Sequence, residues 1–127
     1  MERWNRWRER NPGPFDLTHA DLSRADLSGA NLANLDLHSA NLSEAVLVRA
    51  NLEGSDLHRT NIKAADLSRA VLRGADLRAA NLSQARLFGA DLRKTNIKKT
   101  SFGRAQADAD TKWPQGFDPK ANGVGHS

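Results

Sequence analysis

The chain has 127 residues, no cysteine and a formal net charge of +4 at pH 7. The lack of cysteine excludes disulfide bonds and thiolate metal sites. No segment approaches about 18 consecutive apolar residues, and the first ten residues have no apolar core of the kind found in secretion signals. We therefore expect one cytoplasmic domain that does not bind membranes.

Residues 1–14 differ in composition from the rest of the chain and predict a short helix. The segment from Glu2 to Arg10 contains no helix-breaking residue, and Trp4 and Trp7 share one helix face at a spacing of three. The sequence Asn-Pro-Gly-Pro at 11–14 then ends the helix.

The next segment, residues 15–104, repeats every five residues. Its central position is Leu in fifteen of eighteen units and Ile or Phe in the others. Five residues advance an α-helix by about 500°, which would scatter the leucines, and a straight strand would point successive leucines to opposite faces. The period instead predicts a chain that turns a corner once per unit, which is an all-β solenoid with the leucines inside.

The other positions of the unit are also patterned. A small residue, Ala in twelve units, stands two positions before the central residue, so both point inward, and Asp or Asn lies between them in fourteen units and faces outward. The repeated pattern A(D/N)LXX resembles the pentapeptide-repeat family. This resemblance implies a right-handed quadrilateral parallel β-helix with coils of about 20 residues, or about 4.5 coils in this chain.

Residues 105–127 leave the repeat and contain Trp113 and Phe117. Because the ends of a β-solenoid expose strand edges and core, we expect Trp4 and Trp7 to cap the first coil, and Trp113 and Phe117 to cap the last. The flanking segments WNRWRERNP and TKWPQGFDP resemble those of small bacterial and cyanobacterial family members, with the patterns WNxWRxxNP and TKWPxGFDP.

Charge is distributed unevenly along the repeats. Residues 15–58 carry two Arg against five Asp and two Glu, a net −5, whereas residues 59–104 carry eleven Lys or Arg against three Asp, a net +8. With coils of about 20 residues, seven basic residues line two adjacent sides. We name this set the basic edge: Arg59, Arg73, Arg78, Arg93, Lys94, Lys98 and Lys99. Three interpretations of the basic edge are open: solvated surface charge, a binding site for an acidic protein, or a weak binding site for nucleic acid. No aromatic residue stands among these basic residues to stack on bases.

A second group of residues breaks the outward polar pattern. Apolar residues at outward positions, with arginines around them, have the composition of an interface centre, although single exposed apolar residues are common. The candidate partner surface, called here the apolar patch, consists of Val46, Val48, Arg49, Arg69, Arg86 and Phe88.

Catalytic and metal chemistry have little support in the sequence. His38 and His58 are 20 residues apart and would stack on neighbouring coils beside a column of outward Asp residues. A convex rod offers no concave pocket that excludes water. We therefore assign no catalytic, cofactor or metal-binding residues.

The resulting hypothesis is a non-enzymatic protein-interaction module, either a monomer or a weak homodimer, with an unidentified protein partner. The alternatives are a DNA-mimic modulator of DNA gyrase, which the family resemblance suggests, and a weak binder of nucleic acid or an acidic partner through the basic edge. The positive net charge of +4 argues against mimicry of DNA.

Overall fold

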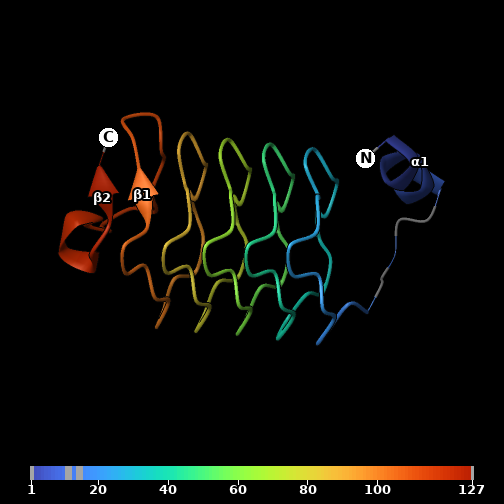
Figure 1. Ribbon diagram of the computed structural model, residues 1–127, viewed down its shortest axis with the longest axis horizontal. Coiled ribbons are helices and arrows are strands. Elements are labelled where there is room, and N and C mark those ends of the chain that lie inside the picture. The colour runs from blue at the N-terminus through green and yellow to red at the C-terminus, as the bar shows by residue number, and fades with distance from the viewer. Residues whose placement is uncertain (1, 11–12, 14–15, 127) are drawn as a thin grey trace.

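The computed structural model describes residues 2–10, 13 and 16–126 as a row of stacked coils (Figure 1). Helix α1 lies at one end of the row, and the C-terminal elements lie at the other. The helices and strands are α1 (Glu2–Arg10), β1 (Gln106–Ala107), the 3-10 helix η1 (Lys120–Asn122) and β2 (Gly125–His126). Within the described ranges, neither helix has the length and apolar character needed to cross a bilayer.

Parallel bridges between outward residues hold the coils together. Asp16 pairs with Asp36, twenty positions later, and the same step repeats in four columns that begin at Asp16, Asp21, Asp26 and Asn31. We name the four sides of the rod after these first residues. The bridges continue beyond residue 104, because the Asp26 column reaches Gln106 and the Asn31 column reaches Lys112. The ladder is therefore longer than the repeat that the sequence shows.

From the second coil on, both backbone groups of an outward residue hydrogen bond to the preceding coil. The Asn51 N–H donates to the Ala30 carbonyl at 2.9 Å, and the Asn51 carbonyl accepts from the Leu32 N–H at 2.7 Å. An outward residue of the first coil has no preceding coil to supply these partners. A rod of this kind therefore needs another group to satisfy that edge.

Every corner contains a residue in the left-handed backbone region. The fifth residue of each of the eighteen units has φ between 57° and 74°, and only four of these residues are glycine. In the turn that follows Leu27, the Ala30 N–H donates a hydrogen bond to the Leu27 carbonyl at 3.0 Å. For an L-residue this region costs about 1–2 kcal/mol. The variable corner positions of the sequence thus share one strict conformation.

The core is a ladder of central residues with small residues beside it. From Leu32 to Leu92 the central residues are at most 2% exposed. Leu17, Leu22 and Leu27 are only partly buried, because the first coil has a neighbouring coil on one side alone. Where a hydroxyl replaces Ala, it is satisfied: Thr60 Oγ1 donates to the Leu57 carbonyl at 2.7 Å.

Candidate functional site

The apolar patch lies on the Asp26 side. Val46 bridges to Asp66, and Asp66 bridges to Arg86, so Val46 and Arg86 stand two coils apart in one column. Val48 and Phe88 occupy the turns that follow these residues. Val46 is 37% exposed, and Val48 and Phe88 are half-buried outside the core. The structure thus gathers these residues on one side of the rod.

Arginines surround the aromatic ring of the patch. The Arg86 guanidinium carbon lies 5.5 Å from the centre of the Phe88 ring, within the range of a cation–π contact. Arg49 and Arg69 are exposed at the corner that follows this side, on successive coils. A hollow beside Phe88 is lined by Arg69, Asp108 and Lys112, among others. The ring therefore lies among charges of both signs, which suits a partner surface of mixed polarity.

The basic edge occupies the two corners that bound a single side, the Asp16 side. The turns that follow this side contain Arg59, Arg78, Lys98 and Lys99, and the turns that precede it contain Arg73, Arg93 and Lys94. Two of the seven charges are engaged within their own units: Arg78 pairs with Asp76 and Arg93 with Asp91, each at 2.7 Å. Among the described residues, the other five form no ion pair.

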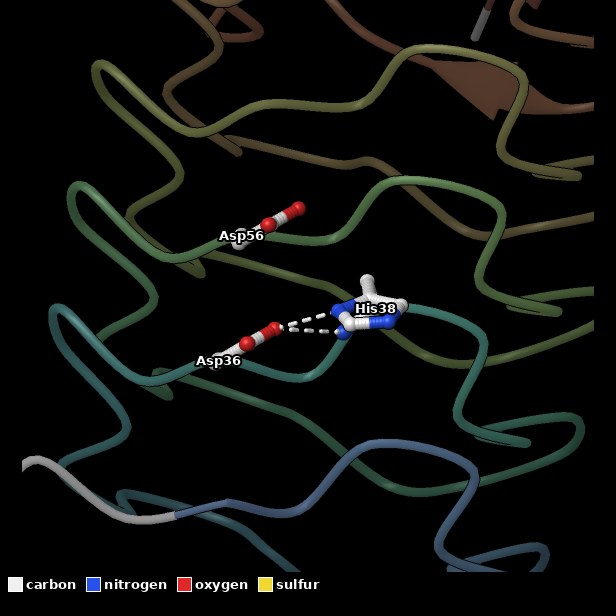
Figure 2. Close-up of side chains that lie close together, drawn as sticks. All are labelled: Asp36, His38 and Asp56. Atoms are coloured by element: carbon white, nitrogen blue, oxygen red, sulfur yellow. Dashed lines mark hydrogen bonds and ion pairs between the residues drawn. The ribbon is translucent and has the colours of Figure 1, made fainter.

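Figure 2 shows Asp36, His38 and Asp56, which lie on adjacent coils of the Asp16 side. Single ligand atoms of the three lie within 4.8 Å of one another. Asp36 Oδ1, however, already accepts a hydrogen bond from the His38 N–H at 3.2 Å and contacts His38 Nδ1 at 2.7 Å. Asp56 Oδ1 likewise accepts the His58 N–H at 3.0 Å. These contacts follow the rule of the repeat, so they do not by themselves indicate a metal site.

The rule is that the outward Asp or Asn accepts the backbone N–H two residues later. Asp21 accepts both the N–H and the hydroxyl of Ser23, at 3.1 and 2.7 Å. The Ser23 hydroxyl holds the pKa of the Asp21 carboxyl below its usual value, and the Arg78 side chain does the same for the pKa of Asp76. The outward position therefore stabilises the corner that follows it.

We expect the melting temperature to fall as the pH drops below about 4. A carboxylate whose pKa is lower in the folded protein than in the unfolded chain stabilises the fold above the unfolded pKa, and this stabilisation is lost as the pH falls through the folded pKa. The pKa is lowered in this way at several outward positions, and the variant to compare replaces four of them with Asn, which six other units carry: Asp21, Asp26, Asp76 and Asp91. Thermal melts between pH 2 and pH 6 should show a shallower dependence for the variant. Equal slopes for the two proteins would contradict the assignment.

Helix α1 supplies partners to the unpaired edge of the first coil. Trp4 Nε1 donates to the Asn31 carbonyl at 2.8 Å, and Asn5 Oδ1 accepts the Asn31 N–H at 2.7 Å. Arg8, which is 7% exposed, donates to the carbonyls of Asn31 and Ala33. No sequence pattern indicated Asn5 and Arg8, because their role depends on where the helix docks. The predicted capping role of the Trp7 side chain falls outside the part of the chain that the structure describes.

Aromatic residues gather at the other end. The Phe102 ring centre lies 5.7 Å from that of Trp113 and 5.1 Å from that of Phe117. Strand β2 pairs in parallel with β1, in the register Gln106 with Gly125, and the preceding Val124 is 7% exposed. Trp113 and Phe117 thus pack against the last central residue of the repeat.

Comparison with known proteins places these features in a family context. Residues 16–47, 33–74 and 65–104 match the family model of pentapeptide repeats, in 8 copies. Together these overlapping matches cover more than half of the chain. Among curated proteins, no sequence match is found.

Solved structures of pentapeptide repeat proteins are similar to this chain. One from the cyanobacterium Cyanothece 51142 is 42% identical, with a TM-score of 0.73, over 73% of this chain and 63% of its own length. This chain thus spans less than two thirds of that protein. One from the Arabidopsis thaliana thylakoid lumen is 31% identical, with a TM-score of 0.59, over 74% of this chain and 71% of its own. QnrB1, a plasmid-mediated fluoroquinolone resistance protein, is 16% identical with a TM-score of 0.44 over 84% of this chain and 67% of its own, which is too slight a likeness to transfer a role.

Proposed function

The chain belongs to the pentapeptide repeat family, and we propose that it is a non-enzymatic module that binds a protein partner through the apolar patch. The observation that carries this proposal is the grouping of Val46, Val48 and Phe88 on one side, with the Arg86 guanidinium over the Phe88 ring. Outward positions elsewhere in the repeat are mostly Asp, Asn or Ser. An apolar departure from a polar pattern, shared by two coils of one side, suits contact with another surface.

The energetic scale fits a modest interaction. Complete burial of an exposed Val or Phe side chain contributes about 1.5–3 kcal/mol. Val48 and Phe88 are already half-buried, so each has less to gain. Association also costs several kcal/mol in lost freedom. We therefore propose a reversible contact with a protein partner, with Arg49 and Arg69 at its rim.

The proposal includes a finer description of the rod. It is a right-handed quadrilateral β-helix of about 4.5 coils, closed by α1 at the first coil and by residues 105–127 at the last. In support, three side chains of α1 hydrogen bond to the edge at Asn31 and Ala33, and Trp113 and Phe117 pack against the last repeat. Closed ends keep the strand edges from pairing with other chains, so that contacts form through the sides.

The test replaces Val48 with Thr and Phe88 with Ser, since Ser68 occupies the same turn position on the coil between them. We expect the melting temperature to stay within a few degrees, because neither side chain belongs to the core. Binding to partners captured by the immobilised wild-type protein should fall about tenfold or more, which corresponds to about 1.4 kcal/mol.

A matched control replaces Glu53 with Thr and Lys63 with Ser, which stand at the same position of their units on other corners. This variant should retain binding. Equal binding by the patch variant and the wild type would contradict the proposal. An early melt of the patch variant would instead place these side chains in the core.

A further inference from the structure

The Asp16 side is divided along the rod into an acidic half and a basic half. Over its first three coils, residues 16–59, the side and its corners carry four acidic residues and one basic residue. Over the last two coils, residues 73–99, they carry six basic residues and one acidic residue. The two halves share one side because the column that begins at Asp16 continues through Asp56 to Asn96.

The charges of both halves are accessible. Asp16 is exposed, and Asp36 and Asp56 are half-buried. Figure 2 shows Asp36 and Asp56 on adjacent coils. Lys98 and Lys99 are exposed at the far end. Asp76 and Arg78 largely neutralise each other in an ion pair, and Arg93 is paired with Asp91 on the neighbouring side. Arg73, Lys94, Lys98 and Lys99 form no ion pair within the described residues, so the basic half keeps a positive charge.

We propose that this side binds a second copy of the chain, with the two rods antiparallel. A two-fold axis across the rods at the third coil would place Asp16 of each copy opposite Lys98 and Lys99 of the other. It would place Asp36 opposite the coil that carries Arg73 and the Arg78–Asp76 ion pair. The third coil, which carries Glu53, Asp56 and Arg59 and a net charge of −1, would face itself across the axis. The first two coils of each copy thus meet the basic half of the other, whereas parallel rods would oppose like charges along their whole length.

This surface is separate from the apolar patch. The Asp16 and Asp26 columns are two different sides of the rod. Substitutions in the apolar patch would leave the charges of the Asp16 side unchanged, and substitutions on the Asp16 side would leave the apolar patch unchanged. The self-association proposed here and the partner binding proposed above can therefore fail independently.

Sedimentation velocity at different salt concentrations gives the first test. Charge pairing between exposed groups is screened over about 10 Å at 0.1 M salt and about 3 Å at 1 M. We expect a dimer whose dissociation constant rises about tenfold or more between 50 and 500 mM NaCl. A protein that remains a monomer at 50 mM NaCl at high micromolar concentration would overturn the proposal.

Two charge-changing variants give the decisive test. Lys98→Glu with Lys99→Glu makes this corner acidic and cancels the positive charge of the last coil, and the fold should tolerate it. Glu53 stands at the position equivalent to Lys98, and Glu44 holds φ 58° at the position equivalent to Lys99, where φ is 62°. Thr18→Lys with His38→Lys brings the net charge of the acidic half from −3 to −1 and places two lysines at the corner that faces residues 98 and 99 of the other copy. Lys63 and Lys98 already occur at this position of the unit.

Each variant alone should be monomeric at 50 mM NaCl, and an equimolar mixture should form a heterodimer with the mass of two chains. Restored association shows complementary surfaces, because a misfolded variant could not regain it. Three results would overturn the proposal: dimers of either variant alone, a mixture that stays monomeric, or a wild-type monomer whose basic half binds duplex DNA with a steep salt dependence.

Discussion

Replacing Leu57 with Ala should lower the free energy of unfolding by about 2–5 kcal/mol. Leu57 is fully buried in the central ladder, between Leu37 on the coil before it and Leu77 on the coil after it. The removed side-chain volume would leave a cavity that rigid coils cannot close by collapse. Denaturant unfolding followed by circular dichroism measures the loss.

The control for this prediction is Arg59→Ala, two residues away. Arg59 is exposed at a corner with φ 58°, and Ala64 and Ala79 hold nearly the same φ at equivalent corners. We expect its cost to stay within about 0.5 kcal/mol, as for other surface substitutions. Similar costs at the two positions would contradict the central ladder, and so would a circular dichroism spectrum dominated by helix.

Deleting residues 108–127 should lower the melting temperature and produce association that persists at high salt. The deletion uncovers Phe102, which is 3% exposed, and removes the strand partner of β1. An exposed strand edge beside an open core pairs with other chains. Light scattering at 500 mM NaCl separates this association from charge pairing between sides, which that salt concentration weakens.

A milder variant, Trp113→Ala with Phe117→Ala, tests the aromatic cluster without removing the chain that follows it. Trp113 and Phe117 have ring centres 4.9 Å apart and pack against the core. We expect a loss of stability and little change in secondary structure. Monomers of the deletion protein that melt at the wild-type temperature would show that the tail does not close the end.

Sequence periodicity was sufficient to predict the inner ladder and the positions that face outward. A spacing of five is incompatible with a helix stripe or a flat strand, and the small residue two positions before each central residue leaves one arrangement that buries both. With the coil of about 20 residues that the family resemblance implies, the stacking of Val46 and Arg86 two coils apart followed from arithmetic. The structure places Val46 and Arg86 in one column, as that arithmetic requires.

Other features do not follow from periodicity. The corner residues vary from Gly to Arg in sequence, and only the structure shows that all eighteen share a left-handed φ. The register of the last pairing is one residue longer than the rest, since Asp91 pairs with Lys112, and no repeat marks that insertion. The docking of Asn5 and Arg8 on the first coil likewise depends on contacts between segments about 25 residues apart.

The sequence alone determined the repeating unit, the buried ladder and the uneven charge, because each of these is written in local spacing that eighteen units repeat. Only the tertiary structure decided which side chains cover the two ends of the rod and which side of the rod each charged corner borders. It showed that both groups of the basic edge border the Asp16 side, whose other half is acidic. The physical reason is that hydrogen bonds between coils connect residues twenty positions apart, so the neighbours of a side chain depend on stacking.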